Sequence, residues 1–210
     1  MGSKCISGLY LLTEPCSDLF ERVSIALKNG VGIVQYRHKN GDENGHQVMA
    51  CRLRDLCRNH QALFIVNDDP GLALICQADG VHLGQSDTSV ARARDILGDQ
   101  ALIGRSTHSL GEAIQAEQQG ADYIGFGCLF PTASKPDTIS ASLEELRLVR
   151  DSVSLPIVAI GGIHAGNVAR AIGAGADAVA VISAVMQARD CRAAVRELRH
   201  QYQMGRSNLF

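Results

Sequence analysis

A regular alternation of two kinds of segment, apolar runs and amphipathic stretches, constrains the fold of this chain more than any other feature. Eight short runs are almost continuously apolar and rich in β-branched residues, and longer amphipathic stretches separate them. The short runs are residues 8–13, 31–37, 63–68, 80–85, 102–107, 123–130, 156–162 and 178–183. Because they lack the polar alternation of a half-exposed sheet, they predict parallel strands buried on both faces.

The stretches between the runs predict helices, among them residues 18–29, 45–59, 109–119 and 142–151. Strict alternation of eight strands with eight helices requires a parallel sheet with right-handed crossovers. We therefore predict an α/β fold, a single-domain (β/α)8 TIM barrel over residues 1–210. The alternative is a doubly wound open sheet, which usually has fewer strands and one switch point.

Composition narrows the class of protein further. The chain has 210 residues, of which 46% are hydrophobic and 20% are charged, and its net charge is −2. These values argue against disorder and give no electrostatic reason to expect a nucleic-acid partner. No apolar stretch approaches the ~18 residues of a membrane span, and no signal peptide is visible. We expect a soluble cytoplasmic protein that acts on small molecules and not on a membrane, with a homo-oligomer left open.

Seven cysteines occur, at positions 5, 16, 51, 57, 76, 128 and 191. They form no CxxC pair and no Cys/His cluster with the spacing of a zinc site. We therefore expect them to be small buried thiols in a reducing compartment.

Cations and hydroxyls follow two of the predicted strands. Catalytic groups of such barrels come from the carboxyl ends of the strands, so these positions carry the functional information. Arg37 and Lys39 end the second run and point to the same side, while Lys135 lies in a loop with Thr132 and Ser134. Such a set suits a phosphate or a pyrophosphate, although any one of these charges alone is also typical of a solvated surface.

Two acids end neighbouring strands. Asp68 follows Asn67 at the end of the third run, and Asp87 follows the fourth. Neighbouring parallel strands lie about 4.8 Å apart, so the two carboxylates either share a proton or share a divalent cation. Beside pyrophosphate-binding cations, Mg²⁺ is the natural occupant. The alternative is that each acid caps the helix that follows it.

The last two strand ends predict a different kind of anion site. Gly161 and Gly162 follow the seventh run, and Ile182 and Ser183 end the eighth. Bare backbone N–H groups at these ends are where barrels commonly bind a phosphate monoester, although a Gly-Gly pair alone is also typical of a tight turn. His82 lies inside the fourth strand and is interpreted as a satisfied interior residue, while His108 is consistent with either a structural or a functional role.

Taken in order, seven short motifs resemble those of the thiamine-phosphate synthase family. They are Q-Y-R-H-K at 35–39, N-D at 67–68, A-D-G-V-H-L-G-Q-S-D at 78–87, S-T-H at 106–108, F-P-T-A-S-K at 130–135, A-I-G-G-I at 159–163 and V-A-V-I-S at 179–183. Each motif alone is modest, whereas the ordered set, from about Leu9 to Ala184, is highly specific.

The resemblance implies a reaction and a role for each residue. In that family 4-amino-2-methyl-5-hydroxymethylpyrimidine diphosphate loses pyrophosphate in a dissociative step, and the nitrogen of a thiazole (carboxylate) phosphate takes the pyrimidine methylene, giving thiamine phosphate. The resemblance assigns the diphosphate to Arg37, Lys39, Asn67 and Lys135, Mg²⁺ to Asp68 and Asp87, and the pyrimidine to Gln35 and Ser106. It assigns the thiazole phosphate to Thr132, Ser134 and the backbone of Gly162, Ile182 and Ser183, with residues 132–142 as a lid.

Some positions depart from the family pattern. Tyr36 and His38 stand where Leu and Glu are usual, Gly71 lies in an altered motif after Asp68, and Ser134 replaces a threonine while keeping its hydroxyl. These departures bear on substrate positioning, and every group assigned to metal or phosphate is retained. Two alternatives stay open, a thiazole tautomerase-like isomerase and a catalytically silent phosphate-binding barrel.

Overall fold

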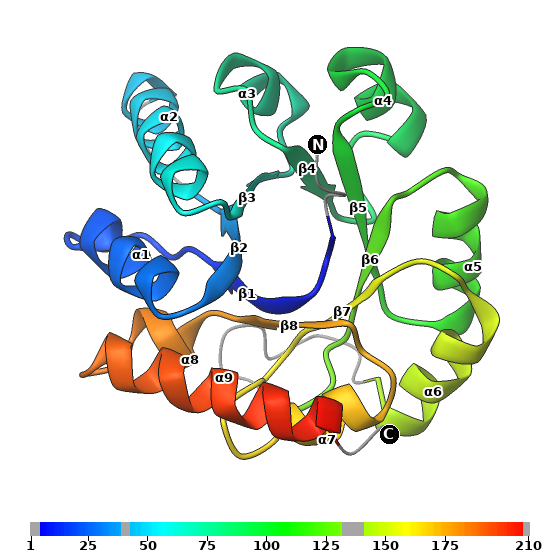
Figure 1. Cartoon of the computed structure of the whole chain (residues 1–210). Coiled ribbons are helices and arrows are strands. Elements are labelled where there is room, and N and C mark those ends of the chain that lie inside the picture. The colour runs from blue at the N-terminus through cyan, green and yellow to red at the C-terminus, as the bar shows by residue number, and fades with distance from the viewer. Residues whose placement is uncertain (1–4, 39–42, 132–140, 208–210) are drawn as a thin grey trace.

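The computed structural model describes residues 5–38, 43–131 and 141–207 and contains eight parallel strands. The strands are β1 (Gly8–Leu12), β2 (Val31–Tyr36), β3 (Leu63–Asn67), β4 (Gly80–Leu83), β5 (Leu102–Thr107), β6 (Tyr123–Phe126), β7 (Ile157–Ala159) and β8 (Ala178–Val181). They pair in chain order, and β1 also pairs with β8, so the sheet closes into a barrel (Figure 1). This confirms the predicted (β/α)8 barrel and excludes the open sheet.

Helices form a ring outside the barrel (Figure 1). They are α1 (Leu19–Lys28), α2 (Glu43–Asn59), α3 (Pro70–Ile75), α4 (Val90–Leu97), α5 (Leu110–Gln118), α6 (Leu143–Ser152), α7 (Val168–Gly173), α8 (Ser183–Met186) and α9 (Cys191–Ser207). The described residues therefore hold one helix more than the eight expected. The addition is the four-residue α8, which begins directly after β8, where barrels often carry a short extra helix.

Two cores explain why the strands are apolar on both faces. Leu9 and Leu11 of β1 belong to the larger core, between the barrel and the helices, whereas Tyr10 and Leu12 belong to a smaller core inside the barrel. Successive side chains of a strand point to opposite faces, so a strand that is buried twice reads as a continuous apolar run.

Three aspartates tie the amino ends of the strands together. Asp79, Asp122 and Asp177 each stand directly before an even-numbered strand. Their carboxylates accept the backbone N–H of Phe64, Ile103 and Ile157, respectively, at 2.7–2.9 Å. The repeated Ala-Asp at 78–79, 121–122 and 176–177 therefore has a structural purpose at the end of the barrel opposite the predicted site.

Seven of the strands end earlier than predicted, and the difference is largest for β6 and β7. β6 was expected to reach residue 130 and β7 to reach 162, but they end at Phe126 and Ala159. The apolar residues beyond β6 leave the barrel and hydrogen-bond along the loop after β7, where Leu129 N–H donates to Ile160 and Phe130 N–H to Gly161. Burial in this loop packing makes them apolar without making them a strand.

All seven cysteines are free thiols. The buried ones, as expected, are Cys57, Cys76, Cys128 and Cys191. The expectation is wrong for Cys5 and Cys16, which are exposed. Both lie in loops that flank β1, where no packed face covers them.

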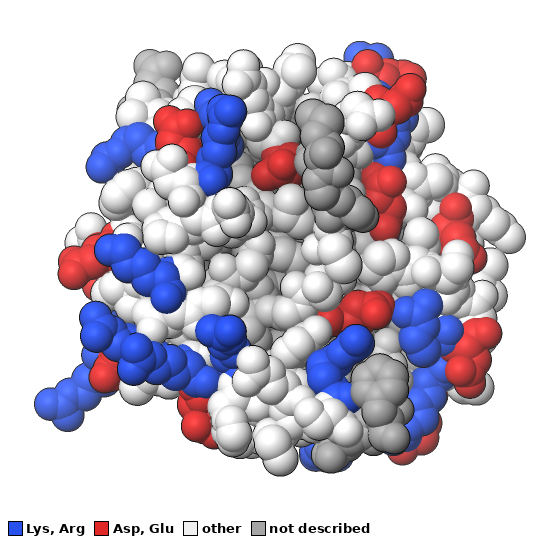
Figure 2. Space-filling view, in the orientation of Figure 1, with Lys and Arg blue, Asp and Glu red and all other residues white. Residues whose placement is uncertain are grey.

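The surface in Figure 2 carries basic and acidic residues around its rim, over the helices, and is largely uncharged at its centre. Within the described part of the chain, we find no helix with both the length and the apolar character needed to cross a bilayer.

Candidate active site

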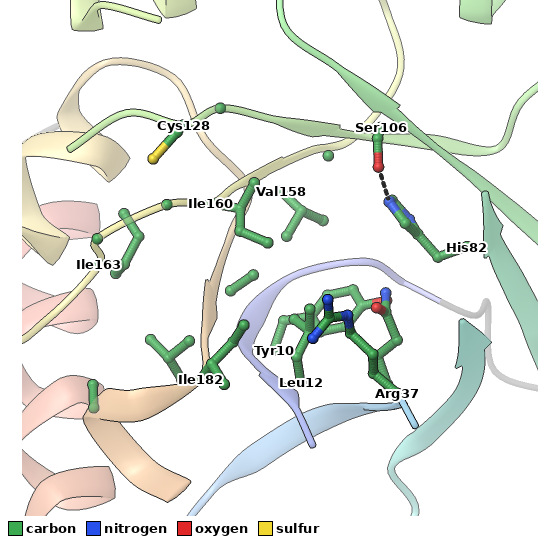
Figure 3. Close-up of a pocket in the computed structure, with 18 of the residues that line it drawn as sticks. Tyr10, Leu12, Arg37, His82, Ser106, Cys128, Val158, Ile160, Ile163 and Ile182 are labelled. Atoms are coloured by element: carbon green, nitrogen blue, oxygen red, sulfur yellow. Dashed lines mark hydrogen bonds between the residues drawn. The ribbon is translucent and has the colours of Figure 1, made fainter. Parts of the chain in front are cut away.

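A cavity of about 450 Å³ opens at the carboxyl ends of the strands (Figure 3). The predicted site residues that line it are Gln35, Arg37, Asn67, Ser106, Gly162, Ile182 and Ser183. Four further predicted residues, Lys39, Thr132, Ser134 and Lys135, and all but the end of the predicted lid lie outside the described residues. The structure thus gathers strand ends that are far apart in the sequence around one cavity.

The two sides of this cavity differ in chemistry. Figure 3 shows Arg37, His82 and Ser106 on one side, and Ile160, Ile163 and Ile182 on the side of β7 and β8. A polar side on β2–β5 therefore faces an apolar wall, and this arrangement suits a ring-bearing ligand with charged substituents.

Arg37 is held at the mouth by a neighbouring strand end. Its backbone N–H donates to the buried Thr13 Oγ1 at 2.9 Å, and the Thr13 hydroxyl donates back to the Arg37 carbonyl at 3.3 Å. This reciprocal pair links the segments after β1 and β2, so the guanidinium extends from a fixed backbone position.

Asp68 and Asp87 are not among the residues that line this cavity, but they interact with each other in the segments that follow β3 and β4, as the sequence predicted. Partial desolvation of its carboxyl group, with hydrogen bonding to Asp87 and the charge of Asp87, raises the pKa of Asp68 to about 6. The amide of Asn67 and the charge of Arg37 oppose this rise. The Asp87 carboxylate also accepts the Gly84 N–H at 2.7 Å, which fixes its position.

Neither acid serves as the helix cap that was the structural alternative. Asp69 caps α3 by accepting the Leu72 N–H at 2.9 Å, and Ser89 caps α4 by accepting the Arg92 N–H at 3.2 Å. Asp68 instead adopts a left-handed backbone with φ of 64°. A non-glycine residue in that conformation is uncommon and is often found at functional sites.

The pair fits a divalent cation that also binds a ligand. A carboxyl group whose pKa is raised by a neighbouring carboxylate is stabilised in its charged form by a cation between the two. Among the described residues, no group of three or more His, Cys, Asp or Glu could form an all-protein metal cage. Mg²⁺ commonly binds one or two carboxylates together with substrate phosphate oxygens, so two acids beside Arg37 suffice.

The raised pKa of Asp68 predicts how the stability of the metal-free protein depends on pH. A carboxyl group with a folded-state pKa near 6, above the unfolded value of about 3.9, binds more protons in the folded state between these pH values. The contribution of Asp68 to the free energy of unfolding should therefore fall as pH rises from 4 to 6, and Asp68→Asn should remove that contribution from the pH dependence. Urea titrations in EDTA test this, and an equally steep fall in the variant would contradict it.

Arg105 braces the loop that carries Asp87, a role the sequence analysis missed. This β5 residue is 9% exposed, and its guanidinium donates to the carbonyls of Gln85 and Thr88, both at 3.2 Å. A charged residue inside an apolar strand was the available signal, because a buried arginine needs partners.

The side of the cavity that the sequence predicts to bind a phosphate monoester is built from backbone. Gly161 and Gly162 both have positive φ, 96° and 62°. A Cβ on Gly162 would lie 2.5 Å from the Pro131 carbonyl oxygen, so only glycine fits there. The buried Asn167, also missed from sequence, donates from its side chain to the Gly162 carbonyl at 2.8 Å and accepts the His164 N–H at 2.8 Å.

The interior histidine is satisfied, as predicted, and it also lines the cavity. His82 Nε2 lies 3.0 Å from Ser106 Oγ, and its Nδ1 lies 3.2 Å from Tyr123 Oη (Figure 3). Gln35 of β2 also lines the cavity, is 2% exposed, and has an Oε1 with no hydrogen-bond partner among the described residues. An unpaired buried acceptor on a cavity wall marks a place for a ligand donor.

His108, which was consistent with either role, forms a local contact in the cavity wall. Its Nδ1 lies 3.1 Å from a Glu112 carboxylate oxygen, and the same oxygen accepts the His108 backbone N–H at 2.7 Å. This contact fixes the start of α5 and therefore favours the structural interpretation.

Among the described residues, a closed (β/α)8 barrel has Arg37 and bare backbone amides on the wall of its cavity, with a pair of carboxylates after two neighbouring strands. These features are typical of the class of phosphate-binding barrel enzymes. Comparison with known families is more specific. A family described as thiamine monophosphate synthase matches residues 9–185. The chain belongs to this family and is a transferase of thiamine biosynthesis.

Individual relatives agree with this membership. The chain is 46% identical over 202 residues to a thiamine-phosphate synthase of Halorhodospira halophila, covering 96% of this chain and 97% of that protein. It is 48% identical to a thiamine biosynthesis bifunctional protein of Geobacter sulfurreducens, covering 92% of this chain but only 39% of that protein. A solved thiamine phosphate pyrophosphorylase from Pyrococcus furiosus superimposes with a TM-score of 0.89, at 41% identity, covering 94% and 96% of the two chains.

Proposed function

We propose that this chain joins 4-amino-2-methyl-5-hydroxymethylpyrimidine diphosphate to a thiazole phosphate, releasing pyrophosphate and forming thiamine phosphate. The observation that carries the proposal is one cavity with two unlike anion-binding sides, lined on one side by Arg37 and Asn67 and on the other by Gly162 and Ser183. A reaction between two phosphorylated rings needs two such sides.

On the diphosphate side, Arg37 and Asn67 would hold the leaving group, and Asp68 and Asp87 would hold Mg²⁺. When bound, the cation would neutralise charge that develops on the departing pyrophosphate. By resemblance, Lys39 and Lys135 would add two further cations. The donors are preorganised where charge develops, an arrangement usually worth more to catalysis than any covalent participation.

On the pyrimidine, the unpaired Oε1 of Gln35 would accept a hydrogen bond from the ring amino group, and Ser106 would contact the same ring. The apolar wall that includes Ile160 and Ile182 would exclude water from the cationic carbon left when pyrophosphate departs. The protein would thus act by positioning two rings and protecting a reactive intermediate.

On the thiazole, the backbone N–H groups of Gly162, Ile182 and Ser183 would surround the phosphate at the start of α8. Asn167 would keep the Gly162 loop in place. By resemblance, Thr132 and Ser134 would add hydroxyls. We keep a cytoplasmic setting as part of the proposal, supported by the seven free thiols.

The test is to incubate the purified chain with both substrates and Mg²⁺, and to quantify pyrophosphate and thiamine phosphate over time. Equal amounts of both products, lost on chelation with EDTA, would support the proposal. A tautomerised thiazole phosphate without thiamine phosphate would identify an isomerase instead. Binding of thiazole phosphate without turnover of either substrate would identify a silent phosphate-binding barrel.

A further inference from the structure

A continuous chain of hydrogen bonds crosses the interior of the barrel beneath the cavity. Gln35 Nε2 donates to Tyr10 Oη at 2.8 Å, and Tyr10 Oη lies 3.0 Å from Tyr123 Oη. Tyr123 Oη lies 3.2 Å from His82 Nδ1, and His82 Nε2 lies 3.0 Å from Ser106 Oγ. This chain of hydrogen bonds therefore joins Gln35 to Ser106, the two residues proposed to contact the pyrimidine.

Both tyrosines in this chain of hydrogen bonds are buried, so each of their polar atoms needs a hydrogen-bond partner within the protein. Tyr10 is 1% exposed, and Tyr123 is fully buried. Burial raises the pKa of both phenols well above the usual value, so each keeps its proton and has one to donate. Every polar atom left unpaired there costs free energy, because no solvent replaces the missing partner.

The direction of donation follows from one end of the chain. An amide nitrogen only donates, so Tyr10 accepts a hydrogen bond from Gln35, and Tyr123 is the partner to which the Tyr10 hydroxyl can donate. Tyr123 then donates to His82 Nδ1, which leaves the ring proton of His82 on Nε2 for donation to Ser106. The opposite direction would leave the Tyr10 proton without an acceptor among the described groups. With this direction of donation, Gln35 presents an acceptor oxygen to the cavity, and Ser106 presents a hydroxyl proton that it can donate to a ligand.

We propose that Tyr10, Tyr123 and His82 are positioning residues that set the hydrogen-bonding polarity of Gln35 and Ser106, and so select a pyrimidine with an amino group over one with a carbonyl. The identity of the ring rests on the proposed function. An amino substituent donates to Gln35 Oε1, whereas a carbonyl at the same position would place two acceptors face to face. Rotation of the Gln35 amide, which would suit a carbonyl, would break its bond to Tyr10.

The tautomer of His82 tests the direction of the chain without any substrate. Long-range proton–nitrogen NMR spectra of protein labelled with ¹⁵N-histidine should show His82 neutral, with its proton on Nε2. Tyr123→Phe removes the donor to Nδ1 and should shift the Nδ1 resonance. A protonated Nδ1 in the unaltered protein would overturn the proposal, whatever the enzyme catalyses.

Ligand discrimination tests the functional consequence. Tyr10→Phe removes the acceptor that holds the Gln35 nitrogen, so the amide is free to turn either face to the ligand. We expect the ratio of Kd values for the 4-oxo and 4-amino pyrimidine diphosphates to fall by about tenfold or more, with tighter binding of the 4-oxo compound. Isothermal titration calorimetry with each compound measures this ratio, and a purely structural role of Tyr10 would not improve binding of the 4-oxo compound.

Tyr202→Phe is the matched control. The Tyr202 hydroxyl also makes two hydrogen bonds, to Gly8 N–H and the Asp177 carbonyl, but at the opposite end of the barrel. This variant should keep the discrimination of the unaltered protein. If Tyr10→Phe also keeps it, the positioning proposal is wrong while the proposed function stands. If the unaltered protein binds neither compound, the proposed function fails instead.

Discussion

We expect Asp87→Asn to lower kcat/KM for the proposed formation of thiamine phosphate by about three orders of magnitude, and to raise the Mg²⁺ concentration required for half-maximal rate. A metal that neutralises a leaving phosphate contributes several kcal/mol to the transition state, and each 1.36 kcal/mol is a factor of ten in rate. Asparagine retains an oxygen that can accept the Gly84 N–H, so the loop keeps its structure while one charged ligand is lost. Initial rates over a range of Mg²⁺ concentrations measure the effect.

Asp95→Asn is the control for this variant. Asp95 is exposed on α4, the helix that follows the Asp87 loop, and its substitution changes the net charge of the chain by the same amount. It should leave the rate and the Mg²⁺ dependence unchanged. Should Asp87→Asn show the same Mg²⁺ dependence as the unaltered enzyme, Asp87 would not be a metal ligand.

The barrel could be predicted because burial on both faces leaves a strong trace in the sequence. Each strand, such as β8 with its run of Ala and Val, packs against helices outside the barrel and against other strands inside it, so most of its positions are apolar. The position of the site could be predicted from the sequence for a related reason. Parallel strands of a barrel all end on the same side, so Arg37, Asp68 and Asp87 had to converge wherever their individual strands ended.

What could not be predicted depends on contacts across the closed barrel. Tyr10 and Tyr123 lie in β1 and β6, more than a hundred residues apart, and each looks like ordinary core packing within its own apolar run. Only closure of the sheet brings their hydroxyls together. By contrast, the cap of α3 had a local signal, because proline favours the first helical position and so places the N-cap at Asp69, directly before Pro70.

The thiazole side is tested most sharply by Gly162→Ala. Gly162 has φ of 62°, a conformation that costs other residues about 1–2 kcal/mol, and the new Cβ would lie 2.5 and 2.6 Å from the carbonyl oxygens of Pro131 and Phe130. Relief of this contact would displace the backbone N–H groups proposed to hold the phosphate. We expect the free energy of unfolding to fall by about 2–4 kcal/mol, and KM for thiazole phosphate to rise by about tenfold to a hundredfold.

Gly173→Ala separates this effect from any general cost of replacing glycine. Gly173 ends α7, and a Cβ built on it meets nothing within 4 Å, so alanine there should leave stability unchanged or raise it by about 0.5–1 kcal/mol. Urea unfolding gives the stabilities, and rates at saturating pyrimidine diphosphate give KM for the thiazole phosphate. An unchanged KM in folded Gly162→Ala would remove Gly162 from the phosphate site. A selective rise in that KM, with KM for the pyrimidine diphosphate unchanged, would show that the two sides of the cavity bind their phosphates independently.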